Sequence, residues 1–561
     1  MPKKITENNE VFNKKGLYLA SSIDDKRITK AIEKLPCDRE GLPLYINYKN
    51  EEGEGYTLSL QNDRIEINAA SVRGAFYAIQ TLRQIYNNEA VKTLVIEDEP
   101  DFGYRGFYHD VTRGKVPTVD TLKKLVDKMA YCKMNSLQLY IEHTFPFKEY
   151  GDNIEKTGYL TADEIREIDQ YCLDNFIDFI PSIPTFGHLF ELLNLPENRE
   201  LQCIENYENN NCRWQDRMAH HTIDPTNPKS IEIIKSMIDQ FVPLFSTKYF
   251  NICCDETFDL EHGKYKDKDT GKLYVDFVNQ IIAHLKSKGK TVMMWADILL
   301  NHPETIEELP EDTIFLNWAY SKEINEDNVK HFYDIKRTQM VCPGTTTWSR
   351  FCERPSVASH NILNFVRAGK KYGASGMLNT NWGYFGNPCT LVLAMYGMFL
   401  GAAASWNADT KADEAFDNAM DALVYEKTGA SELLKELSDI HDIAYENWNG
   451  FTYLYFNNEF KHVPPTESHY KAIEKSKEFI KKLEKEQWKK DNYRKELLIA
   501  AEGLIILSEL SLIALGEKIE KSLKVEKWLD KFSASWLENN KPNELYRIQE
   551  MFRGADKWQV K

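Results

Sequence analysis

The sequence lacks the features that would place the protein in a membrane or outside the cell. Its first residues, MPKKITENNEVFNKKG, contain no apolar core of a secretory signal. No uninterrupted apolar stretch approaches the length of a membrane span. The ten cysteines are scattered without the spacing of a disulfide framework. We therefore expect a cytoplasmic protein whose thiols are reduced and which does not contact a membrane.

Basic charge and the common cofactor motifs are also scarce. Lys and Arg number 70 against 86 Asp and Glu, so the formal net charge is −16 and nucleic acid is not an expected partner. The phosphate loops GxGxxG and GxxxxGK(S/T) are absent, as are CxxC pairs and HxxxH spacing. His143, His188, Cys253 and Cys254 are conceivable metal ligands, but adjacent cysteines on a strand point apart and are better explained by packing. We expect no cofactor and no metal.

What the chain does contain is enough apolar sequence for more than one domain, because 42% of its 561 residues are hydrophobic. GYTLSLQNDRIEINAAS alternates apolar and polar residues, which predicts two strands joined by a turn at Gln61–Asp63. VRGAFYAIQTLRQIY then carries apolar residues at helical spacing. Residues 1–101 are therefore predicted to form a small α+β domain.

A regular alternation of strands and helices begins after residue 101. Eight short apolar or β-branched runs alternate with amphipathic segments such as VDTLKKLVDKMAYC, and Thr161 with Glu164 forms a capping box ahead of another helix. This rhythm predicts a parallel sheet, and eight repeats predict that residues 102–410 form a closed (β/α)8 TIM barrel. An open, doubly wound sheet is the alternative. The runs are RGFYHDV, SLQLYIE, IDFIPSI, YFNICCD, TVMMWAD, TIFLNWA, QMVCPG and GASGMLNTN.

Two further segments depart from this rhythm. A polar insertion at Leu189–Lys229 is longer than an ordinary connection, so we expect it to frame an active site. After residue 410 the strand-like runs disappear and Lys- and Glu-rich helical segments dominate. Residues 411–561 are therefore predicted to be an α-helical domain with a structural role or a contact in a homo-oligomer.

The fourth run, in YFNICCDETFDL, ends in two adjacent acids, Asp255 and Glu256. Neighbouring side chains on a strand point to opposite faces, so both acids can reach one ligand only where the strand is ending. Glycosidic cleavage needs a proton donor at the leaving oxygen and a group that stabilises the anomeric carbon. Acids this close suit a variant in which one is the donor and the other holds the substrate's own 2-acetamido group. In the alternative interpretation, Asp255 caps the next helix and Glu256 lies in its first turn.

Tryptophans occur at or near the ends of the last four predicted strands. Four of them at one rim indicate a pocket with aromatic walls, and aromatic rings pack against the C–H faces of sugars. Carbohydrate is therefore the favoured ligand. These residues are Trp295, Trp318, Trp348 and Trp382.

Three polar residues near other strand ends are candidates for the same site. Glu142 could orient His188, and His188 would then tune the pKa of Glu256. Arg105 could donate its guanidinium to sugar hydroxyls. Each has a structural alternative: the histidine as a satisfied buried residue, the arginine as the partner of an ion pair.

At these residues the sequence resembles glycoside hydrolase family 20, the β-N-acetylhexosaminidases. The resemblance is carried by YRGFYHDVTRGKVPTVDTLKKLVDKMAYCKMNSLQLYIEH, FIPSIPTFGHL, YFNICCDE and MMWADIL, and upstream by GYTLSL, IEINAASVRGAFYAIQTLRQI and IEDEPDFGYRG. It implies a small α/β domain before a catalytic barrel and covers about the first three-quarters of the chain.

The resemblance also implies a role for each matching residue. Glu256 corresponds to the general acid and base, and Asp255 to the residue that orients and stabilises the acetamido group as it closes to an oxazolinium ion. Arg105 corresponds to the arginine that binds ring hydroxyls, and His188 with Glu142 to the relay behind the acid. Trp295, Trp318 and Trp382 correspond to pocket walls, and Trp348 or Tyr320 lies near the position of a tyrosine that bonds the acetamido oxygen.

Five positions depart from the family pattern. Cys253 and Cys254 replace the usual glycines before the acid pair, and Asn251 replaces a frequent histidine. His143 stands where relatives carry an acid, and Tyr384 where a Glu or Asp often binds the outer hydroxyls of the sugar. The change at Tyr384 leaves the choice between GlcNAc and GalNAc open.

The resulting expectation is an exo-acting, retaining β-N-acetylhexosaminidase that removes terminal GlcNAc or GalNAc from glycans. Three alternatives remain at this point. They are a barrel glycosidase that pairs Glu256 with a separate carboxylate nucleophile, a carbohydrate-binding relative without turnover, and a metal-dependent barrel hydrolase.

Overall fold

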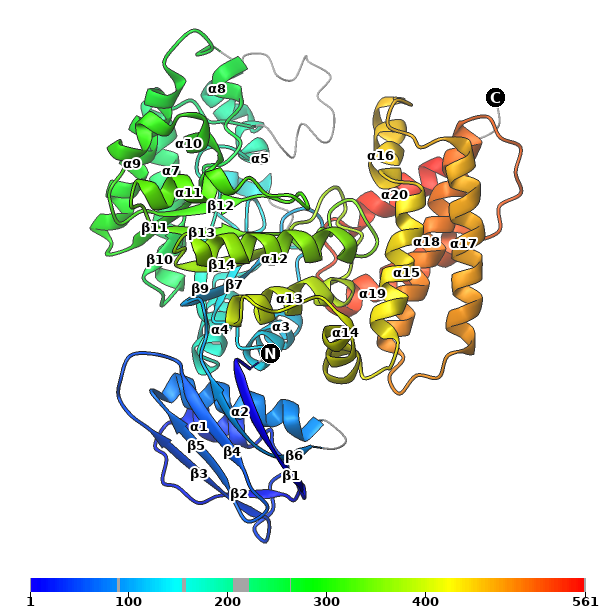
Figure 1. Ribbon diagram of the computed structural model, residues 1–561. Helices are drawn as coiled ribbons and strands as arrows, with labels where there is room; N and C mark the ends of the chain where they lie inside the picture. The colour runs from blue at the N-terminus through cyan, green and yellow to red at the C-terminus, as the bar shows by residue number, and fades with distance from the viewer. Residues whose placement is uncertain (1, 88–90, 154–157, 205–220, 263, 559–561) are drawn as a thin grey trace.

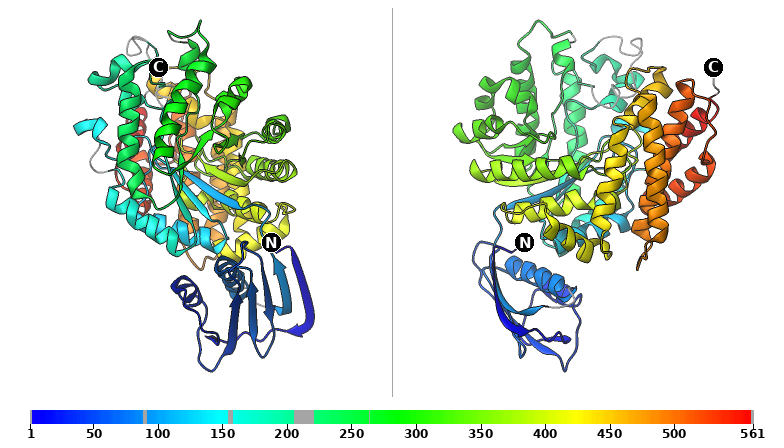
Figure 2. Two further views of the ribbon diagram at one scale, coloured as in Figure 1. Left: turned by 90° about the vertical axis from the view of Figure 1, so that its left-hand side faces the viewer. Right: turned by 45° about the vertical axis from the view of Figure 1, so that its right-hand side comes forward.

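The computed structural model describes the chain except for residues 1, 88–90, 154–157, 205–220, 263 and 559–561. Three parts follow one another along the chain: a small domain with one sheet, a barrel surrounded by helices, and a group of C-terminal helices (Figure 1). The N-terminal domain and the C-terminal helices contact different parts of the barrel (Figure 2). The predicted fold class is confirmed, while the predicted boundaries at residues 101 and 410 stay predictions.

The N-terminal domain is a six-stranded sheet covered by helices. Its strand order is β1-β6-β4-β5-β3-β2, and β4 pairs with β5 in antiparallel fashion, as the alternating pattern predicts. Helix α2 packs on β4 and β5 and buries its apolar face there. The elements are β1 (Lys4–Val11), β2 (Leu17–Leu19), α1 (Lys26–Ile32), β3 (Leu42–Tyr48), β4 (Tyr56–Leu60), β5 (Ile65–Ala69), α2 (Val72–Asn87) and β6 (Lys92–Asp98).

The next eight strands form a closed parallel barrel in the order β10-β11-β12-β13-β14-β7-β8-β9. All eight predicted runs are strands, and the closure excludes the doubly wound alternative. Because the strands are parallel, their C-terminal ends meet at one rim, where (β/α)8 enzymes place their catalytic groups. The strands are β7 (Tyr104–Asp110), β8 (Ser136–Tyr140), β9 (Asp178–Ser182), β10 (Tyr249–Asn251), β11 (Thr291–Trp295), β12 (Ile314–Trp318), β13 (Gln339–Cys342) and β14 (Gly376–Asn381).

Amphipathic helices surround the barrel. The predicted capping box is present, because Thr161 accepts a hydrogen bond from the Glu164 backbone and Glu164 accepts one from the Thr161 backbone. The polar insertion at 189–229 includes helix α5, while its residues 205–220 lie outside the described part of the chain. The outer helices include α3 (Val119–Tyr131), α4 (Ala162–Asp174), α5 (Phe190–Leu193), α7 (Pro228–Phe241), α8 (Asp259–His262), α9 (Thr270–Ser287), α10 (Asp297–Asn301), α11 (Glu326–Asp334), α12 (Pro355–Lys371) and α13 (Met395–Trp406).

The C-terminal part is helical, as predicted. One of its helices, α18 (Asn492–Ala514), is long and apolar enough to cross a membrane by length and composition, although Glu502 and Glu509 interrupt its apolar residues. Within the fold, 89% of its apolar window is buried, which is typical of a helix in the core of a helical domain. The other helices are α14 (Glu414–Met420), α15 (Ala430–Ile443), α16 (Asn447–Asn457), α17 (Thr466–Lys485), α19 (Val525–Asn539) and α20 (Leu545–Ala555).

Candidate active site

The acid pair follows β10 on a turn with an unusual backbone. Cys253, Cys254 and Glu256 have φ angles of +57°, +65° and +50°, in the left-handed region where any residue with a Cβ is strained. This geometry explains why glycine suits the two positions occupied here by cysteine. The turn carries Asp255 and Glu256 beyond the end of the strand, where both side chains can address one pocket.

Hydrogen bonds from neighbouring elements hold this turn in place. The Cys253 N–H donates to Asn251 Oδ1 at 2.9 Å, and the Tyr274 hydroxyl of α9 donates to the Cys254 carbonyl at 2.8 Å. The Glu256 N–H donates to Asp297 Oδ2, at the start of α10, at 3.0 Å. Asp297 therefore holds the backbone of Glu256, the second acid, in place.

His188 lies against both acids. Its Nε2 is 3.3 Å from Asp255 Oδ2 and 3.3 Å from Glu256 Oε2. Burial alone would lower the pKa of His188, but the two carboxylates raise that pKa well above its ordinary value. The neighbouring acids therefore favour the cationic form of the His188 imidazole.

Aromatic side chains at the ends of β11 and β12 and in the segments after β12, β13 and β14 pack together around the acids. The rings of Trp295 and Trp382 lie 6.0 Å apart at 50°, and Trp318 stacks on Tyr320 at 5.1 Å. Trp382 Nε1 donates to the Tyr320 hydroxyl at 2.6 Å, which fixes the orientation of both rings. Trp348 approaches Tyr320 at 5.2 Å and extends the wall.

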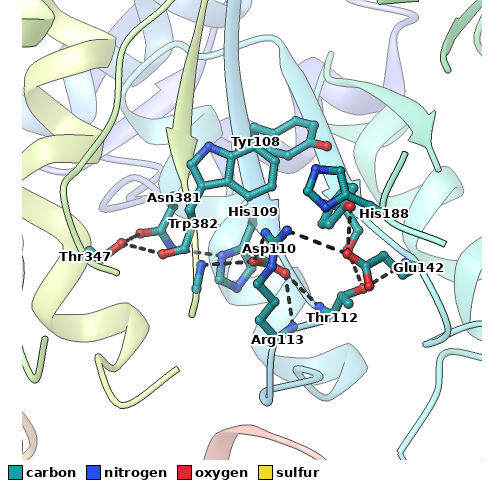
Figure 3. Close-up of polar contacts among 12 residues, drawn as sticks. Tyr108, His109, Asp110, Thr112, Arg113, Glu142, His188, Thr347, Asn381 and Trp382 are labelled. Carbon is teal, nitrogen blue, oxygen red and sulfur yellow. Dashed lines mark hydrogen bonds and ion pairs between the residues drawn. The ribbon is translucent and has the colours of Figure 1, made fainter. Parts of the chain in front are cut away.

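An arginine after β7 completes the rim (Figure 3). Arg113 Nη1 donates to Asp110 Oδ2 at 3.0 Å, and Arg113 Nη2 lies 3.7 Å from Glu142 Oε1. Asp110 also accepts the backbone N–H groups of Thr112 and Gly383, so one buried carboxylate ties the β7 loop to the β14 loop. Burial alone would lower the pKa of Arg113, but the neighbouring acids outweigh this effect and raise the pKa well above its ordinary value. The guanidinium therefore stays charged.

These groups enclose one pocket of about 260 Å³, a volume that suits a single sugar ring. Nine of the eleven predicted site residues line it, and their roles stay predictions. The lining residues are Arg113, His188, Asp255, Glu256, Trp295, Trp318, Tyr320, Trp348, Trp382, Gly383 and Tyr384.

Arg105 is a wrong prediction. It lies at the N-terminal end of β7, away from the catalytic rim, and its side chain is fully buried. Arg105 Nη1 is 2.6 Å from Glu54 Oε2 of the N-terminal domain, and Arg105 Nε donates to the Lys133 carbonyl at 2.9 Å. The structural alternative, an ion pair, is therefore the one observed.

Glu142 is placed behind the pocket rather than in its lining. Its Oε1 accepts a hydrogen bond from the Tyr140 hydroxyl at 2.7 Å, and its negative charge faces Arg113. Burial raises the pKa of Glu142, while Arg113 and His188 act in the opposite direction. The relay through His188 to Glu256 stays a prediction.

The same acids and His188 form a group that could hold a metal ion. Ligand atoms of His188, Asp255 and Glu256 all lie within 4.8 Å of one another, and among the described residues this is the one such group found. One imidazole and two carboxylates are ligands that many divalent metals accept. The expectation of no metal therefore remains a prediction, and chelation tests it.

Comparison with known protein families shows to which family the chain belongs. The model of the glycosyl hydrolase family 20 catalytic domain matches residues 102–340, and that of family 20 domain 2 matches residues 9–99. The chain belongs to glycosyl hydrolase family 20. The two matches together cover more than half of the sequence, and their limits agree with the N-terminal domain and most of the barrel.

Individual family 20 proteins are distant in sequence but similar in fold. A β-hexosaminidase of Porphyromonas gingivalis is 27% identical over 354 residues, which are 53% of this chain and 45% of that protein. The crystal structure of a Flavobacterium johnsoniae chitobiase aligns with a TM-score of 0.62 at 18% identity and covers 98% of both chains. A Vibrio harveyi exo-β-N-acetylglucosaminidase in complex with N-acetylglucosamine aligns with a TM-score of 0.60 at 17% identity, over 78% of this chain and 77% of that one. The chain thus spans about half the length of the curated relatives it matches.

Three residues important for this family 20 site escaped the sequence analysis. Asp110 is the last residue of β7 and Arg113 follows the strand, so the rule that catalytic groups lie at the C-terminal strand ends favours them over Arg105, which is near the start of the strand. Asp297 gave a weaker signal, because it stands two residues after Trp295 at the corresponding end of β11. Its contact with the Glu256 backbone depends on barrel closure.

The departures from the family pattern have different structural consequences. Tyr384 lines the pocket, so an aromatic hydroxyl stands where a carboxylate is common. His143 lies beside the C-terminal helices, with its Nε2 3.4 Å from Glu544 Oε1. Burial alone would lower the pKa of His143, but the hydrogen bond and charge of Glu544, with Glu191 and Glu142, raise it to about 9.

Proposed function

We propose that the protein is an exo-acting, retaining β-N-acetylhexosaminidase that removes terminal β-linked GlcNAc or GalNAc from glycans. The observation that carries this proposal is the placement of Asp255, Glu256 and His188 together in an aromatic pocket of single-sugar size. Membership of family 20 and the names of the similar proteins, β-hexosaminidase among them, support the same activity.

The reaction would use the 2-acetamido group of the substrate as nucleophile. The Glu256 carboxyl gives its proton to the leaving glycosidic oxygen while the acetamido oxygen attacks the anomeric carbon, which breaks the C–O bond and forms an oxazolinium ion. Asp255 accepts the N–H of that ion and balances its positive charge. A water molecule then attacks the anomeric carbon and gives a proton to Glu256, while the bond from that carbon to the acetamido oxygen breaks and the acetamido group is restored, so the sugar leaves with its configuration retained.

The arrangement of acids favours this route over an enzyme nucleophile. Asp255 and Glu256 are consecutive residues of one turn, and their oxygens lie within 4.8 Å of each other. This separation excludes an inverting site, whose carboxyl groups are about 6.5–9.5 Å apart, but it is close to the roughly 5–5.5 Å of a retaining site with a carboxylate nucleophile, so the position of both acids on one turn carries the argument. Among the described residues that line the pocket, no third carboxylate is present to attack from the other face.

Aryl glycosides with and without the acetamido group test the proposal. We expect turnover of p-nitrophenyl 2-acetamido-2-deoxy-β-D-glucoside and no measurable turnover of the matched 2-hydroxy glucoside, because the hydroxyl cannot close an oxazolinium ring. Equal turnover of both would favour a separate carboxylate nucleophile. Binding of the acetamido sugar without turnover would favour a non-catalytic relative, and loss of turnover with a chelator would favour a metal hydrolase.

Substitution of the two acids separates their roles. Asp255→Asn removes the charge that stabilises the oxazolinium ion, so kcat should fall by about 100-fold or more on every substrate. Glu256→Gln removes the proton donor, so kcat should fall strongly for a poor leaving group and less for an activated phenol. Equal losses of Glu256→Gln activity across a series of leaving groups would contradict the role of Glu256 as acid.

We also propose a cytoplasmic location, a glycan as the partner, and no binding to nucleic acid or membrane. The nine described cysteines are all free, which is in keeping with a reducing compartment, and the net charge of −16 disfavours anionic partners. Homo-oligomerisation through the C-terminal helices remains part of the proposal. Cell fractionation tests the location, and light scattering of the purified protein tests the oligomeric state.

A further inference from the structure

A second cavity, of about 390 Å³, lies between the barrel and the C-terminal helices. On the barrel side it is lined by α3 and by the segments that follow β7 and β14. On the other side it is lined by the segment between α14 and α15, the start of α18 and the end of α19. We call this space the interdomain cavity, and it is larger than the sugar pocket of about 260 Å³.

The lining of the interdomain cavity is cationic, although the chain as a whole has a net charge of −16. Four lysines and two glutamates line it. Burial lowers the pKa of a lining histidine, His109, to about 4, so the imidazole adds no positive charge. Both glutamates and two of the lysines have partners of opposite charge, which leaves Lys115 and Lys128 in excess. The pairs are Lys490 with Glu426, Lys124 with Asp120, and Lys495 with Glu538.

Neither Lys115 nor Lys128 has a carboxylate within ion-pair distance among the described residues. Lys115 is 5% exposed, and its Nζ donates to the carbonyls of Pro388 and Cys389 at 3.3 Å and 2.8 Å. The described residues thus accept two of its three N–H donors. Burial lowers the pKa of Lys115 to about 8, while Cys389 and Glu496 act in the opposite direction, and burial also lowers the pKa of Lys128. An anion beside these ammonium groups would offset the cost of burying their charge.

Hydroxyl, amide and aromatic groups complete the lining. The rings of Tyr425 and Tyr493 stack with their centroids 4.3 Å apart, and Thr390 Oγ1 is buried without a hydrogen-bond partner among the described residues. Asn492 and Tyr493 are the first two residues of α18, and the N-terminal end of a helix favours negative charge. These groups suit a ligand that carries hydroxyls as well as an anion. Side-chain amides come from Asn387, Asn492, Asn539 and Asn540.

The size and the charge of the cavity together select a phosphorylated monosaccharide. A phosphate supplies the anion for Lys115 and Lys128, and the hydroxyls of a sugar ring can reach the amide and hydroxyl groups. A phosphate by itself would leave most of the volume of about 390 Å³ unfilled. An uncharged sugar would leave both ammonium groups buried without a counter-charge.

The inner wall of the cavity reaches residues that hold the catalytic pocket (Figure 3). His109, Thr347 and Asn381 line the cavity. Asn381 Nδ2 lies 2.9 Å from His109 Nδ1, and Asp110, the next residue after His109, binds the arginine of the sugar pocket. Thr347 Oγ1 lies 2.9 Å from Asn381 Oδ1 and 3.0 Å from the carbonyl oxygen of Trp382, a wall of that pocket. A ligand in the cavity therefore contacts groups that are bonded to pocket residues or next to them in the chain.

We propose that the interdomain cavity binds a phosphorylated monosaccharide through Lys115 and Lys128, and that this binding strengthens substrate binding in the catalytic pocket. A ligand that fits the cavity stabilises the docked arrangement of barrel and helices in which both spaces are formed. The two ligands then favour the same state, so each raises the affinity for the other. No bond is made or broken in the cavity. The binding is independent of the proposed hexosaminidase activity, and only the kinetic measurement rests on it.

Calorimetric titration of the full chain with glucose 6-phosphate tests the binding, because this sugar lacks the acetamido group that the catalytic pocket is proposed to hold. We expect saturable binding with a Kd below about 1 mM, and binding of glucose or inorganic phosphate at least about tenfold weaker. In Lys128→Ala the affinity for glucose 6-phosphate should fall about tenfold or more. Lys123→Ala is the matched control and should change it less than twofold, because Lys123 lies on the same helix but pairs with Glu167 and does not line the cavity.

Steady-state kinetics test the coupling between the two sites. Saturating glucose 6-phosphate should lower KM for the p-nitrophenyl N-acetylglucosaminide about threefold or more in the wild type and in Lys123→Ala, and should leave KM unchanged in Lys128→Ala. A KM that is unchanged or raised in the wild type would overturn the coupling.

Three results would overturn the binding site itself. They are the absence of saturable binding of glucose 6-phosphate, equal affinity for inorganic phosphate, and equal affinity of the Lys128→Ala and Lys123→Ala variants. Saturable binding of glucose 6-phosphate without turnover of any aryl glycoside would instead overturn the hexosaminidase assignment and with it the coupling, but not the binding site.

Discussion

Arg105 and Arg113 stand eight positions apart on the β7 segment and have unrelated surroundings. Arg113 lies at the rim of the sugar pocket and is oriented by Asp110 and Glu142. Arg105 lies at the other end of the strand and joins the barrel to Glu54 of the N-terminal domain. One arginine therefore lines the candidate pocket at one end of the strand, and the other joins two domains at the opposite end.

Replacing each arginine by lysine should separate these two roles. Arg113→Lys keeps the charge but loses the forked donor, so KM for the aryl N-acetylglucosaminide should rise about 10- to 100-fold, equivalent to about 1.5–3 kcal/mol. Arg105→Lys should lower the melting temperature and leave KM unchanged, because its partners lie outside the pocket. Steady-state kinetics and calorimetry on both variants measure the difference. A raised KM in Arg105→Lys would contradict this assignment.

At the scale of elements, the turn after β10 has a strained backbone and carries the two acids of the candidate site. Three of the four residues Cys253–Glu256 adopt left-handed conformations, and Asn251, Tyr274 and Asp297 hold the turn by hydrogen bonds. Cys253 fits because its small thiol packs against the Tyr108 hydroxyl and Ser182. The turn therefore tolerates cysteine as a compromise between backbone freedom and packing.

Substitutions at Cys253 should reveal the two contributions. Cys253→Gly relieves strain but loses the thiol contacts, so stability should stay within about 1 kcal/mol of the wild type. Cys253→Val places a β-branched residue at a positive φ, so the protein should lose about 2 kcal/mol or more, and kcat should fall as the acid pair shifts. Calorimetry and aryl glycoside kinetics measure both. A valine variant as stable and as active as the wild type would show that the turn is not strained.

At the scale of the whole molecule, the C-terminal helices are tied to the barrel by polar contacts as well as by packing. Lys541 Nζ lies 2.7 Å from Glu164 Oε2 of the capping box, and His143 beside the catalytic rim meets Glu544. The pKa of His143 is raised to about 9 in the folded protein, above the ordinary value of 6.5. Its charged form therefore stabilises the docked state.

The sign of this effect predicts an alkaline weakening of domain docking. The contribution of His143 is fully present below pH 6.5, declines as pH rises, and is lost above about pH 9, with a size on the order of 2–3 kcal/mol. In Glu544→Gln the histidine loses its main partner, so the advantage of the wild type in melting temperature should be larger near pH 6 than near pH 10, where the pairing of Glu544 with Arg547 still contributes. A difference that is constant from pH 6 to pH 10 would exclude His143 as its source.

Features that depend on neighbouring residues along the chain were predictable from the sequence. The eight strands, the capping box at Thr161 and the acid pair at a strand end follow from periodicity and local hydrogen bonding, which the sequence contains directly. The tryptophans were placed because parallel strands bring their C-terminal ends together. The prediction of Arg105 is wrong because this residue stands near the start of its strand, away from the rim where the C-terminal strand ends meet.

The sequence by itself determined the three-part architecture and the presence of two adjacent acids at a strand end, because both are encoded in patterns a few residues to a few tens of residues long. Only the tertiary structure decided which arginine faces the pocket, that Asp297 holds the Glu256 backbone, and that the helical domain forms one side of the interdomain cavity. These facts join residues that come together only when the barrel closes and the helices dock. Such contacts depend on the packing of whole elements, which no local pattern specifies.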